Sequence, residues 1–465
     1  MLWLLFLLTF ALGTFRAYHD YQTPGPFDVQ HLGFCDFHNG VYFPAKAWLR
    51  GDNPYSGQYA AEYPVMRQVP LYAPFVFPLH AWLATLPLSL AEIAYQFTML
   101  IIVVLIGRTV ANSLVQAAPQ RLRIWHGPLT GAIALLVALS RAGHTTIHSG
   151  YFTLELTLAT LLVFHWAQQR PNLAVLALAF TAIKPTYAIP LGWILLAQGR
   201  FRLVGQAVAL ATTLSLLALA PTIRGQWRAD PSGSLSTAIS DVVETMRGTQ
   251  DVHREQNWEK PAISWTRVDL LGAVAKWTRS EPNDVAHLGW MVVILLSLTP
   301  FFWRSRHLVD SRHLVGYSTA MALAAMLVSL YRHAYDTGVL VAPVCGACLA
   351  CCDWQTLSGP LRRTVAGLLA FPLVNYLSTR LVLEQLPAAE SFVRVVCGLN
   401  TAAITSALLV LILFNQRRLP PFCRRTESER LEPVAKRRHA VTSSLLAQGI
   451  STTVPSLGDN LARVA

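Results

Sequence analysis

Charged side chains are scarce in this sequence of 465 residues, where only 13% are Asp, Glu, Lys or Arg and 53% are hydrophobic. A water-soluble protein of this length needs more polar side chains to cover its surface. The shortage therefore excludes an ordinary soluble fold and indicates a lipid environment. The net charge of +12 largely reflects a basic tail, so it does not indicate nucleic-acid binding.

Cysteine is sparse as well, with seven residues whose distribution shows no disulfide pattern. Four of them lie in the apolar run Cys345-Gly-Ala-Cys348-Leu-Ala-Cys351-Cys352. No His or carboxylate stands within that run, which favours helix packing over metal binding. The outer loops also lack an Asp-rich metal motif, so we expect no metal and no other cofactor.

What the chain has in quantity is long apolar runs. A helix needs about 20 residues to cross roughly 30 Å of hydrocarbon, and a helix satisfies its own backbone hydrogen bonds there. The runs predict an all-α, polytopic membrane bundle of about twelve helices, near residues 1–15, 92–110, 127–142, 150–167, 172–183, 185–198, 203–220, 285–303, 314–330, 337–352, 364–379 and 393–414. The two short halves that meet at Lys184-Pro185 can also be one kinked span.

Arginine sets the predicted orientation, because short cytoplasmic loops carry an excess of Lys and Arg. With the N-terminus inside, the arginine-rich loops all face the cytoplasm: Arg108, Arg121, Arg123, Arg170, Arg200, Arg202, Arg304, Arg306, Arg312, Arg362 and Arg363. The long loops 18–92 and 221–284 then lie outside. Counting Tyr72–Leu90 as a span would reverse this arrangement, so we expect a re-entrant or interfacial helix there.

These patterns divide the chain into a membrane domain, 1–414, and a basic, Ser/Thr-rich tail, 415–465. We expect the protein in the cell membrane with both termini cytoplasmic. The tail either contacts anionic lipid headgroups or serves only to fix the topology. No Lys or Arg precedes the first apolar run, which favours an uncleaved first helix over a signal peptide.

The first outer loop holds the most specific pattern. Asp36 stands directly before Val41–Leu49, whose apolar residues share one helical face, as an amphipathic helix at the membrane surface requires. Gly51 then ends the helix and Asn53-Pro54 forms a turn. A carboxylate is thereby expected at the outer interface.

This order of features, continued by a Tyr/Pro-rich approach to the next apolar segment, resembles glycosyltransferase family 87 of the GT-C superfamily. Gly150-Tyr151 at the start of a membrane helix and Ala182-Ile183-Lys184-Pro185 in a broken hairpin extend the resemblance, which covers roughly residues 1–415. It implies inverting transfer of a hexose, typically mannose, from a polyprenyl-phosphate donor to an acceptor hydroxyl at the extracytoplasmic face. The implied partners are that donor, a glycan or glycolipid acceptor and membrane lipids.

Asp36 matches the family's outer-loop aspartate, which implies the role of general base for the acceptor hydroxyl. The alternative is that Asp36 caps the surface helix, since Asp favours helix starts. The competing carboxylates of the same loop are Asp20, Asp28, Asp52 and Glu62.

The donor phosphate calls for cations near the outer interface. We assign this role to Lys184, Arg332 and His333, because ionisable residues in apolar surroundings are functional candidates. The alternatives are a snorkelling Lys184 and an interfacial belt at residues 331–336. We assign sugar or acceptor binding to Asp336, Tyr335, Glu62, Tyr63 and His148, and acceptor recognition to the loop 221–284, which contains Trp227, Trp258, Trp265 and Trp277.

Two other classes of protein stay open at this point. A secondary transporter would also use a broken helix with a buried cation, but it predicts internal repeats, and the two halves show no convincing likeness. A non-catalytic membrane scaffold need not gather its polar residues. A single cavity that holds Asp36, Lys184 and His333 therefore distinguishes an enzyme from a scaffold.

Overall fold

The computed structural model describes residues 1–24, 31–229, 234–255, 260–304, 314–379, 382–383 and 390–416. Asp28, Trp258, Arg306, Arg312 and the tail from residue 417 lie outside these ranges. The regular secondary structure of the described part is helical, and its only β contact is an isolated antiparallel bridge between Arg267 and His333. Residues Met1–Leu413 form one compact unit.

Six helical segments in this part of the chain are long and apolar enough to cross a membrane. They are Leu2–His19, Leu88–Ala117, Pro119–Leu139, Phe201–Ala229, Val285–Arg304 and Arg394–Asn415. Shorter apolar helices, Thr153–Trp166, Pro171–Thr181, Pro185–Ala197, Tyr317–Ser329 and Ala334–Cys348, accompany them. The all-helical membrane class is thus confirmed, whereas the count of twelve spans stays a prediction.

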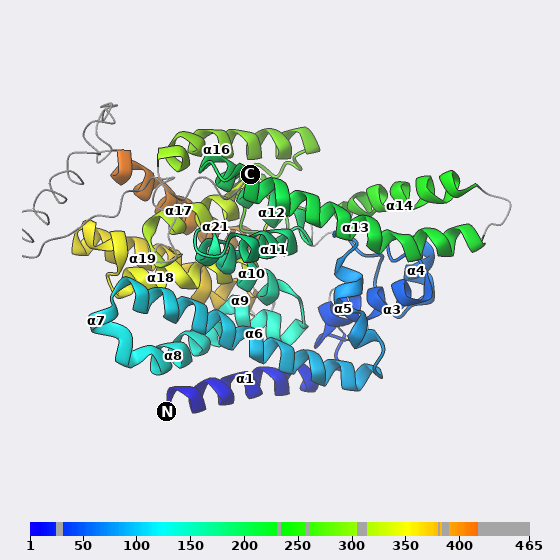
Figure 1. The fold of residues 1–465 in the computed structure, drawn as a ribbon, viewed down its shortest axis with the longest axis horizontal. Helices are drawn as coiled ribbons and strands as arrows, with labels where there is room; N and C mark the ends of the chain where they lie inside the picture. The colour runs from blue at the N-terminus through cyan, green and yellow to red at the C-terminus, as the bar shows by residue number, and fades with distance from the viewer. Residues whose placement is uncertain are drawn as a thin grey trace, which may run out of the picture. The chain divides into compact units, whose positions relative to one another are not determined.

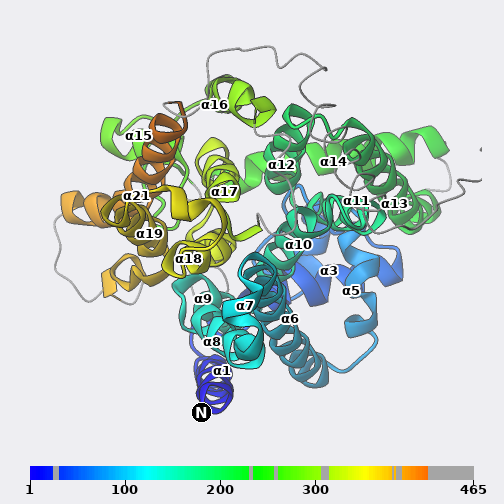
Figure 2. The ribbon, with the colours of Figure 1, turned by 60° about the vertical axis from the view of Figure 1, so that its left-hand side comes forward.

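The first three of these segments pack together. Helix α1 (Leu2–His19) lies against α8 (His126–Leu139), which packs against α6 (Leu88–Ala117) (Figures 1 and 2). The short helices α7 (Pro119–Leu122) and η2 (Arg123–Trp125) join α6 to α8. Helix α1 extends four residues beyond the predicted 1–15.

Between α1 and α6, the loop predicted to lie outside folds into short helices: α2 (Cys35–Phe37), the π-helix η1 (His38–Tyr42), α3 (Phe43–Arg50), α4 (Gly57–Glu62) and α5 (Val76–Ala84). Gly51 ends α3 in the left-handed conformation with φ 85°, as predicted. Helix α5 has nine residues, too few to cross a bilayer. The stretch Tyr72–Leu90, predicted to be one re-entrant or interfacial helix, is divided between two helices: α5 occupies its middle, and its last residues belong to α6.

The helix predicted at the membrane surface, Val41–Leu49, is more buried than the sequence indicates. Val41 at the end of η1 and Ala45 in α3 are fully buried, whereas Leu49 is 47% exposed. Trp48 donates a hydrogen bond from Nε1 to the Ala218 carbonyl at 2.6 Å. A Cβ on Gly225 would meet the Gly51 carbonyl oxygen at 1.9 Å. Glycine at 225 thus lets the long helix α13 (Phe201–Ala229) press against the end of α3.

The chain breaks at Lys184 as the sequence predicts, and two separate helices flank the break. Three residues separate helix α11 (Pro171–Thr181) from α12 (Pro185–Ala197), and the last of them, Lys184, occupies the N-cap of α12 in an extended conformation. Proline at the first position of α12 fixes this start. Before them come α9 (Arg141–Ser149) and α10 (Thr153–Trp166).

The remaining helices complete the unit. Helix α14 (Leu235–Glu255) packs on α13 (Figure 1). Helix α17 (Tyr317–Ser329) is buried along its whole length and leads into η5 (Ala334–Leu340), which packs on α9, α10 and α17. The other elements are α15 (Leu270–Thr278), α16 (Asp284–Arg304), α18 (Val341–Cys348), η6 (Cys352–Thr356), α19 (Gly359–Val374), η7 (Tyr376–Ser378) and α21 (Glu390–Gln416).

Candidate functional site

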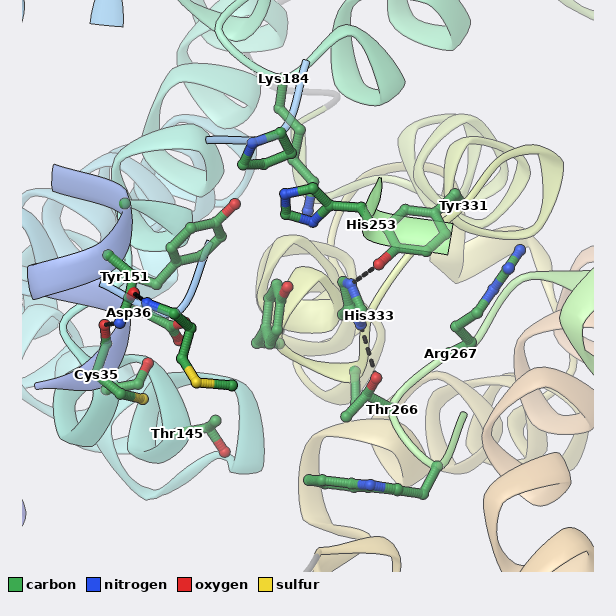
Figure 3. A pocket seen from close by; sticks show the side chains of 18 of the residues that line it. Cys35, Asp36, Thr145, Tyr151, Lys184, His253, Thr266, Arg267, Tyr331 and His333 are labelled. Atoms are coloured by element: carbon green, nitrogen blue, oxygen red, sulfur yellow. Dashed lines mark hydrogen bonds between the residues drawn. The ribbon is translucent and has the colours of Figure 1, made fainter. Parts of the chain in front are cut away.

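A cavity of about 1240 Å³ lies where α1, α2, α9 and the loop before η5 converge. Its lining includes Asp36, Lys184 and His333 together. In Figure 3, Asp36 and Tyr151 lie on one wall, His333 with Tyr331 and Thr266 on the facing wall, and Lys184 above them. Residues from distant parts of the sequence therefore share one chamber.

Asp36 reaches this chamber from the first turn of α2, where it is half-buried. Phe34 occupies the N-cap position of α2 in the left-handed conformation with φ 59°, and Tyr42 is the N-cap of α3. Asp36 is therefore the N-cap residue of neither helix, which disfavours the capping alternative. A non-glycine residue in this conformation costs free energy and persists only where its surroundings hold it.

Two contacts directly after Asp36 hold its helix to α6. The Phe37 ring stacks on Tyr95 with centroids 4.9 Å apart. His38 Nε2 lies 2.8 Å from Glu92 Oε1, and both side chains are almost completely buried. The π-helix begins at His38, and such turns are frequent at functional sites. This pair therefore fixes the direction in which Asp36 points.

Glu92→Gln is expected to lower kcat of the sugar transfer that the family resemblance implies by about tenfold and to leave the KM for the donor unchanged. The reason is that Asp36 shifts within its site while the donor contacts stay intact, and small misplacements are costly in catalysis. Steady-state kinetics of the purified variant measure both constants. A variant with wild-type kcat would remove Glu92 from this positioning role.

Lys184 belongs to a buried ion pair on the neighbouring wall. Its Nζ lies 3.3 Å from both carboxylate oxygens of Asp336, and the two side chains are 5% and 0% exposed. Asp336 also accepts the Tyr187 hydroxyl at 2.7 Å and the His333 backbone N–H at 2.9 Å. Asp336 does not line the cavity. Its contacts make it the anchor of Lys184, not the sugar-hydroxyl acceptor we predicted.

Arg332 and His333 differ from their predicted roles. Arg332 is completely buried outside the cavity lining, lies over the Tyr187 ring at 3.9 Å and donates to the Thr186 carbonyl. His333 lines the cavity, but Nδ1 bonds Thr266 Oγ1 at 2.7 Å and Nε2 bonds the Tyr331 hydroxyl. Both ring nitrogens thus have protein partners, so the geometry favours Lys184 over these two for contact with a phosphate.

Burial lowers the pKa of two cavity histidines, His253 and His333, from 6.5 to about 3. Arg67 lowers the pKa of His253 further, and Lys184 that of His333. Both side chains are therefore neutral at neutral pH. His333 can support a ligand by hydrogen bonding but does not supply a positive charge.

These two histidines predict an acid-sensitive fold. Below pH 6.5 both histidines bind protons in the unfolded chain, whereas in the folded chain they stay neutral down to about pH 3. The two histidines therefore contribute their full stabilisation above pH 6.5, and this stabilisation is lost as the pH falls toward 3. We expect the melting temperature in detergent to fall through this window and to fall less steeply in His253→Gln, which keeps a donor for the Gln68 carbonyl. Parallel curves for variant and wild type would contradict this.

The other predicted site residues separate into two groups. Tyr335 and His148 line the cavity, as do Asp20 and Trp265. Glu62 is exposed and bonded to Gln58, while Tyr63 donates to Asp52 at 2.6 Å; none of these lines the chamber. Trp227 and Trp277 are exposed elsewhere. The roles predicted for Glu62 and Tyr63 therefore have no support in the geometry.

The sequence analysis missed most of the basic lining. The described lining contains three carboxylates, Asp20, Asp36 and Glu281. Its basic residues are more numerous: the cations Arg16, Arg67, Arg141, Lys184, Lys260 and Arg267, and the histidines His19, His144, His148, His253, His287 and His333. Most of them lie in the predicted outer loops 18–92 and 221–284 or in α9, and that placement was the signal available in the sequence. The chamber is suited to anionic ligands.

Fold and site together define a helical membrane protein with a cation-rich cavity that also holds a half-buried carboxylate. The sequence model of glycosyltransferase family 87 matches residues 71–331, which is more than half of the chain. The protein therefore belongs to glycosyltransferase family 87 and is a glycosyltransferase. In comparisons with curated proteins and with solved structures, nothing matched the chain.

Proposed function

We propose that this glycosyltransferase transfers a hexose, in the first instance mannose, from a polyprenyl-phosphate donor to an acceptor hydroxyl at the extracytoplasmic membrane face. The protein resides in the cell membrane with both termini in the cytoplasm, and its fold is of the GT-C type. The observation that carries the proposal is that Asp36 and Lys184 line one cavity. A cavity that held the carboxylate without cations would not suit a phosphate leaving group.

In the proposed reaction, Asp36 accepts the proton of the acceptor hydroxyl while that oxygen attacks the anomeric carbon. The bond between this carbon and the phosphate oxygen breaks on the opposite face, so the anomeric configuration inverts. Polyprenyl phosphate leaves with the bonding electron pair. Lys184, held by Asp336, stabilises the developing charge on the phosphate.

This chemistry needs no metal ion, because protein cations serve the departing phosphate. We expect transfer by the purified protein to be unchanged by a chelator such as EDTA, measured as initial rate before and after dialysis. A rate that collapses with EDTA and returns on addition of a divalent cation would overturn this part of the proposal.

The proposal is tested with purified protein in lipid vesicles that contain membrane extracts as the source of acceptors. Radiolabelled polyprenyl-phosphate-mannose is the first donor and the corresponding glucose donor the second. Transfer that requires the protein and a polyprenyl-phosphate donor supports the proposed reaction, and comparison of the donors identifies the hexose. Transfer from a nucleotide sugar with none from either lipid donor would refute it.

A further inference from the structure

Three cations of the cavity lining are almost completely buried, and two of them are neutralised within the protein. Lys184 is 4% exposed and pairs with Asp336. Arg267 is 2% exposed and forms a double hydrogen bond with Asp269 at 2.8 and 2.9 Å. The third, Arg141, is 3% exposed and has no carboxylate within ion-pair distance among the residues the structure describes.

The hydrogen bonds of Arg141 leave it incompletely satisfied. Its Nη2 donates to the Ser378 carbonyl at 2.7 Å, whereas the buried Nη1 has no partner in the described part of the chain. A buried guanidinium without a counter-charge is costly for the fold. Persistence of such a group in a cavity wall indicates that its charge is compensated by a ligand.

Arg141 stands in a cluster that is separate from Lys184. Arg16, Arg141, His144 and Tyr376, here called the α9 subsite, all line the cavity, and Arg16 Nη1 lies 3.3 Å from His144 Nε2. Burial, with Arg16 and His148, lowers the pKa of His144 to about 4, so the arginines carry the charge. Among the carboxylates of the described lining, Asp20 forms the printed ion pair with this subsite: it lies 3.6 Å from Arg16 and also bonds His19 and His148.

The neighbours of Asp36 contact both cationic regions. The far end of α9 contacts its helix, because Phe34 N–H donates to the His148 carbonyl at 3.0 Å. Arg141 is at the other end of α9, about 10 Å away at about 1.5 Å per residue. Lys184 Nζ lies over the ring of Tyr151, which shares a wall with Asp36 (Figure 3). A base for acceptor hydroxyls must lie between donor and acceptor.

We propose that the α9 subsite binds an anionic group, a phosphate or a carboxylate, carried by the acceptor. Arg141 supplies the charge and Lys184 serves the donor at the other end of the chamber. Recognition of an acid by an arginine of this kind confers specificity for charged acceptors. This inference rests on the proposed function only for the identity of the occupant; the existence of a second anion subsite is independent of catalysis.

The binding test uses native mass spectrometry of the purified full chain, which resolves complexes by their mass. The probes are a short-chain polyprenyl phosphate, a short-chain phosphatidic acid as lipid phosphate, glucose phosphate as soluble phosphate, and the uncharged diacylglycerol. We expect wild type to form a ternary complex with one polyprenyl phosphate and one of the two other phosphates. The phosphate that binds identifies the source, lipid or soluble.

Arg141→Met is expected to raise the Kd for the second anion by roughly 10- to 100-fold and that for polyprenyl phosphate by no more than about twofold. Arg141→Lys keeps the positive charge, so its affinity for the second anion should fall less than that of Arg141→Met. Arg108→Met removes the same charge from an exposed position of α6 and is the matched control. If Arg141→Met does not fold, Arg141→Gln, which can still bond the Ser378 carbonyl, replaces it.

Two results would overturn the second subsite: wild type that binds polyprenyl phosphate but no second anion, or Arg141 variants that bind it as wild type does. For the occupant, the labelled product of the transfer assay should bind an anion exchanger once the lipid donor is removed. A neutral product would refute an anionic acceptor. Wild type that binds no polyprenyl phosphate would count against the proposed function, not against the α9 subsite.

Discussion

Asp36→Asn is expected to reduce the rate of transfer from polyprenyl-phosphate-mannose by about 10²-fold or more, because the amide cannot accept the proton of the acceptor hydroxyl. The substitution preserves the size and position of the side chain in the first turn of α2. Binding of the donor should therefore be almost unchanged. Initial rates of the purified variant in vesicles of the same lipid composition measure the effect.

Asp52→Asn is the matched control for this variant. Asp52 belongs to the same outer loop, but it accepts the Tyr63 hydroxyl and does not line the cavity. We expect Asp52→Asn to transfer at close to the wild-type rate. An active wild type together with an equally active Asp36→Asn would leave the family assignment intact and exclude Asp36 as the base.

Breaking the ion pair between Lys184 and Asp336 is expected to have the second large effect. Lys184→Met leaves the Asp336 carboxylate buried without this cation, which costs about 3 to 5 kcal/mol of stability in comparable pairs. Transfer should also fall, by about 10²-fold, because the phosphate loses a cation. Melting temperature in detergent and initial transfer rate measure the two losses separately.

The double variant Lys184→Met/Asp336→Asn distinguishes the structural role from the functional one. The Tyr187 hydroxyl and the His333 backbone N–H bond different oxygens of Asp336, so the amide introduced at position 336 can accept only one of these two hydrogen bonds, but it leaves no carboxylate buried there. The stability loss of the double variant should therefore be smaller than the sum of the two single losses, whereas transfer stays low. Recovery of transfer together with stability would show that Lys184 acts only through the fold.

Prediction from the sequence was most successful where a local rule applied. Gly51 ends α3 because a left-handed residue at that position favours glycine, and Pro185 starts a new helix after Lys184 because proline suits the first helical position. Both were predicted. The number of membrane spans was harder, because several apolar helices are too short to cross alone, and length is the main criterion for counting them.

Site residues were harder to predict than helices. Asp36, Lys184, His333, Tyr335 and His148 reach one cavity, whereas Arg332 and Asp336 lie behind its wall and Glu62 and Tyr63 lie away from it. Consecutive residues such as Tyr335 and Asp336 differ in this way because a helix directs successive side chains to different faces. A polar cluster in sequence therefore indicates where a site is, without telling which members face it.

The sequence by itself determined that this protein is helical and resides in a membrane, and it showed where the chain breaks and where the chemistry-bearing loops lie. These properties follow from hydrophobicity and local backbone preferences, which act over a few residues. Only the tertiary structure decided that Asp336 holds Lys184, that Asp269 holds Arg267, and that Arg141 has no such partner among the described residues. Charge compensation depends on distances of a few ångströms between residues far apart in the chain, which no local pattern records.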